Sequence, residues 1–381
     1  MRSRHLLACF CGALASGGAL LFACNSSNDA LPPIYTHIGG GDGGAEDAAP
    51  PNDSGSVVTL ADGEVVEACV ETSGASPDGG ITIGPTALAF DPCGNGSPDA
   101  LYWDATNSVL YIGDDQNAAI WTWSDAKGFQ KLASVPVDDG GSTVLGGIAG
   151  YGNLIVVSRN GGGASGALFQ YDITTTTGIA TTIGGAVDPT RHRTGVAYDS
   201  TGARFFSAAW GGEAGAGPSG TLDLIGVLTT TPYVTGLDQP HGVLVSGTQF
   251  IVGDNGKGAV IAFPVAAEDI LDAGAAAAAD DAGDAGDAAA AALYTTLATI
   301  EGVDQLSAGP GGSILAGQHL PDGGAPQLQQ ISADGGVVAV QASATFTKLG
   351  GIAYDTTYNR VFVADSNGGS VRTIKIYPLA Q

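Results

Sequence analysis

Six copies of a short apolar segment recur along the chain and constrain its fold more than any other feature. The copies are VLYIGDD from Val109, LIVVSRN from Leu154, RFFSAAW from Arg204, QFIVGDN from Gln249, SILAGQH from Ser313 and RVFVADS from Arg360. Their start positions are separated by 45, 50, 45, 64 and 47 residues. The long interval contains an Asp/Ala-rich insert, so the underlying period lies in the mid-forties. Such a period indicates one supersecondary unit that is repeated.

Each copy lies between further segments that are typical of short strands. Eight to ten residues before it comes a segment of small residues such as GGIAYDT (350–356), and after it comes a third segment such as GAVIAFP (258–264). Weaker fourth segments follow, and Gly, Asn and Asp mark the turns between them. Four antiparallel strands in each period predict an all-β fold, a six-bladed β-propeller over residues 81–381. A β-sandwich and a seven-bladed ring are the alternatives.

The sequence also predicts how the ring closes and how three tryptophans pack. The last copy reaches the end of the chain soon after its third strand, so we expect residues 80–90 to supply the fourth strand and close the ring. Trp103, Trp121 and Trp123 fall on adjoining strands of the first blade. This placement predicts packing between blades for the three indoles, rather than a cage for a ligand.

The first 23 residues are typical of a lipoprotein signal peptide. A short apolar run ends in Leu21-Phe22-Ala23-Cys24, which resembles the bacterial lipobox, whose cysteine is lipidated and becomes the first mature residue. We therefore predict that Cys24 anchors the chain in the cell envelope, with an ordinary secretory signal as the alternative. Asn25 in place of an aspartate favours the outer membrane of a Gram-negative bacterium.

The segments outside the blades have few apolar side chains that could form a core. Residues 24–53 are rich in Gly, Pro, Ala and Asp and are expected to form a flexible, disordered tether, and residues 54–80 lead into the propeller. Cys69 and Cys93 are expected to pair as a disulfide in an oxidising compartment, with two unpaired thiols as the alternative. The insert at 268–292 lacks the ligand pattern of a calcium loop and is expected to be a disordered or partly helical surface segment.

The charge of the chain limits its partners. It has 38 Asp and Glu residues against 13 Lys and Arg, a formal net charge of −25. Binding to nucleic acid needs clustered cations that displace counterions from phosphate, so no nucleic-acid partner is expected. The same charge disfavours contact with anionic lipid headgroups, so we expect membrane association to depend on lipidated Cys24.

Antiparallel strand order gathers polar residues at one face of the predicted propeller. The starts of first strands and the ends of second strands share this face, and His192, His241 and His319 all fall there. Imidazole, carboxylate and amide groups that converge on a channel could bind zinc or calcium. The candidate ligands are His192, His241, Asp304, His319, Asn160, Asn255 and Asp365, and the same face collects Asp99, Asp114, Asp115, Arg159, Arg193, Trp210, Asp254 and Ser366. For the Asp and Asn residues, the alternative is the formation of Asx turns.

The pattern GIAYD followed by RVFVADSNGGSV is similar to NHL-type repeats and to the SMP-30/gluconolactonase family of six-bladed propellers. DQPHGVLV (238–245) resembles the corresponding segment of streptogramin-lyase-like propellers, which draws attention to His241. The resemblance covers roughly residues 81–381. The SMP-30 type uses a metal-binding Glu in its first strand, and residues 80–105 contain no Glu, so the ligand set that the resemblance implies is incomplete.

Two functions remain open from the sequence. The first is a lipid-anchored module that binds a protein or a glycan. The second is a hydrolase or lyase that uses calcium or zinc at the channel, with His241 or His319 as metal ligand or base.

Overall fold

The computed structural model describes most of the predicted propeller and a short segment before it. The described residues are 56–59, 65–68, 86–92, 95–137, 142–161, 166–175, 177–185, 191–211, 219–265, 294–319, 326–333, 335–341, 346–366 and 372–379. The predicted signal, the tether, Cys24, Cys69, Cys93 and the 268–292 insert lie outside these residues. Across the described part of the chain, none of the helical structure is long and apolar enough to cross a bilayer.

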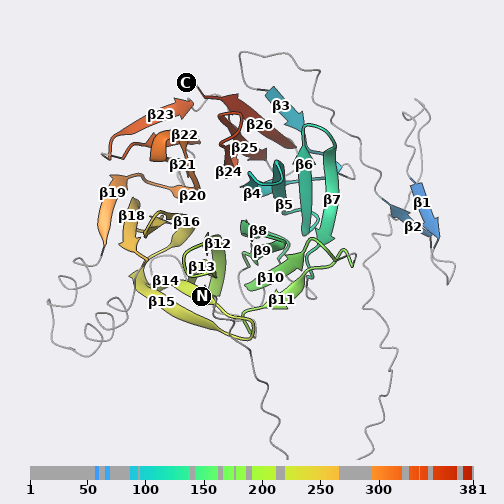
Figure 1. The fold of residues 1–381 in the computed structure, drawn as a ribbon, viewed down its shortest axis with the longest axis horizontal. Coiled ribbons are helices and arrows are strands. Elements are labelled where there is room, and N and C mark those ends of the chain that lie inside the picture. Colours follow the sequence, from blue (N-terminus) through green and yellow to red (C-terminus); the bar gives the residue numbers. More distant parts are fainter. Residues whose placement is uncertain are drawn as a thin grey trace, which may run out of the picture. The chain divides into compact units, whose positions relative to one another are not determined.

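Six antiparallel four-stranded sheets form a ring of blades (Figure 1), as the repeat predicts. Blade 1 comprises β4 (Pro98–Asp104), β5 (Val109–Asp114), β6 (Ala119–Ser124) and β7 (Gly128–Ser134). Blade 2 comprises β8 (Leu145–Tyr151), β9 (Leu154–Arg159), β10 (Ala167–Asp172) and β11 (Thr181–Ile183). Blade 3 comprises β12 (Arg191–Asp199), β13 (Arg204–Gly211), β14 (Gly220–Ile225) and β15 (Thr230–Leu237).

The second half of the chain repeats the same order of strands. Blade 4 comprises β16 (Pro240–Ser246), β17 (Gln249–Asp254), β18 (Ala259–Pro264) and β19 (Thr295–Thr299). Blade 5 comprises β20 (Val303–Ala308), a 3-10 turn η3 (Pro310–Gly312), β21 (Ile314–Gln318), β22 (Gln327–Ile331) and β23 (Val337–Gln341). Blade 6 comprises β24 (Leu349–Asp355), β25 (Arg360–Ser366), β26 (Arg372–Pro378) and β3 (Thr86–Ala89). Before the ring, β1 (Ser56–Thr59) pairs with β2 (Val65–Ala68).

The ring closes as the sequence predicts, with a strand from the other end of the propeller. β3 pairs antiparallel with β26, and the register aligns Leu88 with Ile374. Leu88 and Phe90 are buried in the same apolar cluster as Ile374, which joins blade 6 to blade 1. The prediction that residues 80–90 supply the missing strand is therefore confirmed.

Aromatic side chains fill the contact between blades 1 and 6. The Trp103 and Phe362 rings are stacked with centroids 5.3 Å apart, and Trp123 meets the edge of Phe362 at 5.6 Å. Trp121 is 2 % exposed and contacts Phe90 edge to face. Buried aromatic pairs of this kind stabilise a core beyond the area that they bury. The three indoles thus pack between blades, as predicted.

Glycines let the first strands of neighbouring blades approach each other closely around the axis. A Cβ atom on Gly195 would lie 2.3 Å from the His241 carbonyl oxygen of the next blade, and one on Gly351 would lie 2.2 Å from the Asp99 carbonyl oxygen. No side chain fits at these distances. The small residues of the first strands therefore reflect backbone-to-backbone packing, which brings the starts of all first strands close to the axis.

Buried aspartates at the ends of three second strands hold the loop that precedes the first strand of the same blade. Asp254 accepts hydrogen bonds from the backbone N–H groups of Asp238 and Gln239, at 2.9 and 3.0 Å. Asp365 and Asp114 do the same in blades 6 and 1, and all three carboxylates are fully buried. Buried carboxylates that are satisfied by backbone donors have a structural role.

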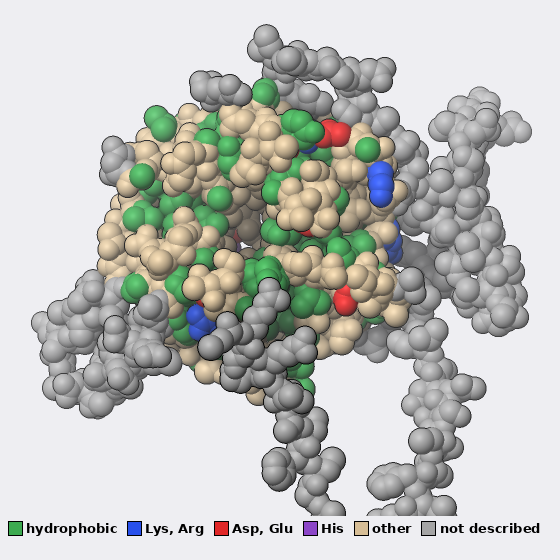
Figure 2. Space-filling view, viewed as in Figure 1, with side chains coloured by type: hydrophobic (Ala, Val, Ile, Leu, Met, Phe, Trp, Pro, Cys, Tyr) green, Lys and Arg blue, Asp and Glu red, His purple; other side chains and the backbone are tan. Residues whose placement is uncertain are grey.

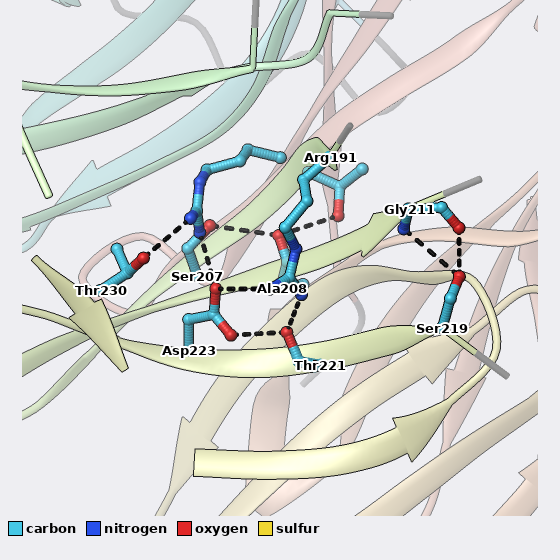
Figure 3. Close-up of polar contacts among 10 residues, drawn as sticks. Arg191, Ser207, Ala208, Gly211, Ser219, Thr221, Asp223 and Thr230 are labelled. Carbon is cyan, nitrogen blue, oxygen red and sulfur yellow. Dashed lines mark hydrogen bonds and ion pairs between the residues drawn. The ribbon is translucent and has the colours of Figure 1, made fainter. Parts of the chain in front are cut away.

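A separate polar network lies inside blade 3 (Figure 3). Asp223, on β14, accepts a hydrogen bond from the Arg193 guanidinium at 3.1 Å and lies 3.7 Å from the Arg191 guanidinium. Thr230, on β15, accepts a further bond from Arg193 at 3.0 Å. The network ties β12, β14 and β15 together.

Candidate active site at one end of the central channel

Every first strand carries a β-bulge shortly after its start. The register with the second strand shifts between Pro98/Leu101, Leu145/Gly147, Arg193/Val196, Pro240/Val243, Val303/Leu306 and Leu349/Ile352. Asp99, His241 and Asp304 occupy equivalent positions within the bulges of β4, β16 and β20. A bulge turns residues out of the regular ladder and re-aims their side chains. The three polar residues therefore gather where the first strands begin, at one end of the channel.

The ends of the second strands supply the remaining side chains at this end of the channel. Asp115, Asn160 and His319 directly follow β5, β9 and β21, and Trp210 lies near the end of β13. We call this end of the channel the mouth, defined by Asp99, Asp115, Asn160, His192, Trp210, His241, Asp304, His319 and Lys348.

A hydrogen-bonded histidine–aspartate pair from blades 4 and 5 is the central feature of the mouth. His241 Nδ1 lies 2.8 Å from Asp304 Oδ1, and the two side chains are 20 % and 30 % exposed. Because a carboxylate can only accept, Nδ1 carries the proton of this bond and Nε2 holds the lone pair of the neutral ring. Among the described residues, nothing binds Nε2. The pair therefore presents a proton-transfer atom whose tautomer is set by Asp304.

Each partner shifts the pKa of the other. Burial favours the neutral imidazole, but the hydrogen bond with Asp304 and the charges of Asp304, Asp254 and Asp99 outweigh it and raise the pKa of His241. Burial also opposes ionisation of Asp304, but the hydrogen bond and charge of His241, with help from Lys348 and His319, lower the pKa of its carboxyl group. The pair therefore favours an imidazolium beside a carboxylate.

A second histidine shares the mouth but has the opposite shift. Burial, together with repulsion from His241, lowers the pKa of His192. Its ring stacks on Trp210 with centroids 4.1 Å apart, and Trp210 in turn lies 6.4 Å from the His241 ring. His192 Nδ1 also lies 3.3 Å from Asn160 Oδ1 of blade 2. Around neutral pH, His192 is therefore a neutral group on an aromatic wall.

Blades 1 and 6 complete the mouth with two carboxylates and one amine. Lys348 Nζ lies 3.9 Å from Asp99 Oδ1. Burial and the charge of Asp304 raise the pKa of Asp99 to about 7, against the lowering effects of Lys348 and His241. Burial and the charge of Asp99 raise the pKa of Asp115, whose Oδ1 accepts the Leu145 backbone N–H at 2.7 Å. The charge of Asp304 thus acts on Asp99, and the charge of Asp99 acts on Asp115, so the ionisation of neighbouring carboxyl groups is linked at this end of the channel.

Four of the seven candidate ligands from the sequence make direct contacts in the mouth: Asn160, His192, His241 and Asp304. His319 is near enough for its charge to act on Asp304. Asn255 donates its backbone N–H to the Gln239 carbonyl oxygen, and among the described residues its side chain forms no hydrogen bond with a mouth residue. Asp365 is buried, its Oδ1 accepts the backbone N–H groups of residues 347 and 348, and its Oδ2 forms an ion pair with Lys375.

Two arginines that the sequence places on this face turn into the blades instead. The Arg159 side chain is 1 % exposed and lies over the Phe169 ring at 5.1 Å. Arg193 binds Asp223 inside blade 3. Lys348 is the mouth residue that sequence patterns did not select. It lies in the loop before β24, outside the strand pattern, and only its distance from Asp99 reveals its role.

One side chain crosses the channel beneath the mouth. Gln305 Nε2 donates a hydrogen bond of 2.7 Å to the Gly146 carbonyl oxygen, from blade 5 to blade 2. The residues equivalent to Gln305 in the other first strands are Ala100, Gly147, Gly195, Gly242 and Gly351. The sequence could have predicted this crossing, because five of the six equivalent positions carry Gly or Ala and leave room at the axis for one long side chain.

The described side chains do not form a metal site. No group of three His, Cys, Asp or Glu side chains in the described ranges converges closely enough to hold a metal ion. His241 also uses Nδ1 for Asp304, which leaves one ring nitrogen for any other partner. The calcium or zinc expected from the sequence therefore stays a prediction.

Solved structures with this arrangement of blades include proteins of several activities. A gluconolactonase from Xanthomonas campestris superposes with a TM-score of 0.54 at 13 % identity, covering 77 % of this chain and 89 % of that one. A PQQ-bound aldose sugar dehydrogenase from Streptomyces coelicolor gives 0.53 at 13 % identity, covering 78 % and 99 %. The calcium-binding protein regucalcin from Agrobacterium tumefaciens gives 0.52 at 13 % identity, covering 74 % and 90 %.

The chain is a six-bladed propeller of the architecture shared by SMP-30/gluconolactonase-like proteins and related propellers. At these identities the likeness concerns the fold. Neither the models of protein families nor the curated proteins give a match to the sequence. Function must therefore be argued from the mouth.

Proposed function

We propose that the mouth binds a small molecule and processes it by general acid–base catalysis, as a hydrolase or a lyase. The observation that carries this proposal is the 2.8 Å hydrogen bond between His241 and Asp304 at the end of the channel. A histidine held in one tautomer by a carboxylate, with the opposite nitrogen available, is the usual arrangement for moving a proton to or from a substrate.

Opposite pKa shifts in like groups support distinct acid and base roles. His241 is shifted upward and His192 downward, while Asp99 is shifted to about 7 and Asp304 downward. Environments that separate the pKa values of neighbouring groups allow an acid and a base to coexist near neutral pH. The mouth contains two such pairs, His241 with His192 and Asp99 with Asp304.

Each residue then has a defined task. In a hydrolysis, the fraction of His241 that is neutral takes a proton from the attacking water through Nε2, and the fraction of Asp99 that is still protonated returns a proton to the leaving group. In an elimination, His241 takes the proton from carbon instead. Asp304 is a positioning residue, and the Lys348 ammonium stabilises negative charge that develops on the substrate. His192 and Trp210 form a flat wall against which a ring can stack.

The proposal is tested by turnover measurements on a panel of aldonolactones and aryl esters, with lactones placed first because of the gluconolactonase likeness. His241→Gln and Asp304→Asn should each lower kcat/KM at least about 100-fold, or about 3 kcal/mol. Asn255→Ala, at the same face, is the matched control and should keep turnover within about twofold. Turnover that survives His241→Gln would rule out the assignment. Saturable binding of a lactone without turnover would favour the binding module instead.

We also propose that Cys24 anchors the propeller to a membrane of the cell envelope. The support is the lipobox-like Leu21-Phe22-Ala23-Cys24 and the acidic chain, which gives little affinity for anionic headgroups. Fractionation of cells that express Cys24→Ser should move the protein to the soluble fraction. Membrane retention of this variant would contradict the proposal.

A further inference from the structure

The other end of the channel holds a cavity of about 420 Å³ beneath the first strands. All six blades contribute to its walls, through the second halves of β4, β8, β12, β16, β20 and β24. Figure 2 shows the hollow at the centre of the ring, with hydrophobic side chains around it. Cavities of this size are within the range that holds small ligands.

The walls of this cavity, which we call the rear cavity, carry no charge. None of the residues that line it is Asp, Glu, Lys, Arg or His, although the chain has a net charge of −25. The lining includes aliphatic residues such as Ile148, Leu244 and Ile352, together with four tyrosines and two serines. A charged ligand would lose its hydration here without gaining a counter-charge. The walls therefore favour a neutral, largely apolar ligand.

Two of the four tyrosines that line the rear cavity have their hydroxyl groups bound within the protein. Tyr102 donates its hydroxyl to the Gly150 carbonyl oxygen at 3.0 Å, and Tyr354 donates to Asn359 at 2.7 Å. Tyr151 and Tyr198 stack with centroids 4.2 Å apart, and Tyr151 is 55 % exposed. The stacked pair also lines a neighbouring groove of about 350 Å³. An exposed, stacked pair at the edge of an apolar cavity suits a flat ring.

We propose that the rear cavity is a second ligand site, which binds a neutral, flat, mostly apolar small molecule. It is independent of the chemistry at the mouth, because Gln305 crosses the channel between the two ends. The Tyr151–Tyr198 pair supplies the stacking surface, and the aliphatic side chains supply apolar contacts.

The test uses N-phenyl-1-naphthylamine, a neutral aromatic probe whose emission rises in apolar surroundings, titrated into the purified full chain. Saturable binding with one site per chain is expected. Ser307→Trp fills the cavity from a small lining residue on β20 and should weaken binding at least tenfold. Tyr151→Ala removes the exposed ring and should weaken it at least fivefold. The matched control is His241→Gln, at the mouth, which should leave probe affinity unchanged.

Charge provides a second readout. The anionic relative 1-anilinonaphthalene-8-sulfonate should bind at least tenfold more weakly than the neutral probe, because no cation lines the cavity. The proposal is overturned if the neutral probe does not saturate, if both substitutions leave its affinity unchanged, or if the anionic probe binds as tightly. Should Ser307→Trp fail to fold, judged by its thermal transition, the result with Tyr151→Ala decides.

Discussion

The two ends of the central channel are built from the same six strands and yet differ completely in chemistry. At the mouth, bulges in β4, β16 and β20 present Asp99, His241 and Asp304. A few residues further along each strand, the rear cavity is lined without a single charged group. The difference shows that the position of a residue along a first strand decides which end of the channel it lines. The bulge turns polar side chains toward the mouth, whereas the regular ladder beyond it places apolar side chains at the rear cavity.

The same polar group placed at two positions of β16 should show whether the two ends of the channel differ in their tolerance of polar side chains. Val243 is 6 % exposed, and Val243→Asn removes buried apolar surface while adding an amide that needs partners, so it should cost about 3 kcal/mol. His241→Asn, two residues earlier at the mouth, should cost about 1 kcal/mol. Urea unfolding measures both. Equal costs would show that the two ends do not differ as described.

A second substitution separates structure from chemistry within the mouth end itself. Asp254 is fully buried and accepts three backbone hydrogen bonds, so Asp254→Ala should lower the free energy of unfolding by about 2–3 kcal/mol. The adjacent Asn255→Ala should change it by less than about 0.5 kcal/mol. If Asp254→Ala were neutral by the same unfolding measurement, the buried aspartates would not hold the blades.

The third prediction concerns the pH dependence of stability at the mouth. Asp99 has a folded pKa of about 7 against an ordinary value of 3.8, so the folded protein holds a proton that the unfolded chain has already released. Its contribution therefore makes stability fall as pH rises from about 4 to about 7, by about 1.4 kcal/mol for each pH unit at the steepest. Asp99→Asn should remove this part of the slope in thermal unfolding at a series of pH values. An unchanged slope would contradict the raised pKa.

The smallest expected effect belongs to the side chain that crosses between the two ends. Gln305→Ala removes one hydrogen bond to the Gly146 carbonyl oxygen and should cost about 1 kcal/mol by urea unfolding. Gln116→Ala, in an exposed turn, is the control and should lie within about 0.5 kcal/mol. A loss no greater than that of the control would mean that Gln305 does not bridge the channel in solution.

Much of the fold could be predicted from the sequence, because six copies at one period permit few architectures. The closing strand followed from the short last copy, and β3 confirms it. The shared face of His192, His241 and Asp304 also followed, since antiparallel order alone decides which strand ends meet. These predictions needed only periodicity and strand direction.

The pairings within the mouth could not be predicted in the same way. His241 and Asp304 lie 63 residues apart and meet because blades 4 and 5 pack closely and both strands bulge at the same position. Strand-end position suggested Asp365 as a ligand, but it could not show that Asp365 Oδ1 accepts two backbone N–H groups. Lys348 lies before its strand, so no periodic signal selects it. Contacts between blades depend on packing that a strand pattern does not encode.

Asp304 should make His241 a stronger base than His192 in the same mouth. Titration of the imidazole resonances by NMR, assigned through single His→Gln variants, tests it directly. We predict that His241 titrates above 6.5 and His192 below it, and that Asp304→Asn lowers the pKa of His241. If His241 titrates at or below 6.5 and its pKa does not respond to Asp304→Asn, then Asp304 does not raise the basicity of His241.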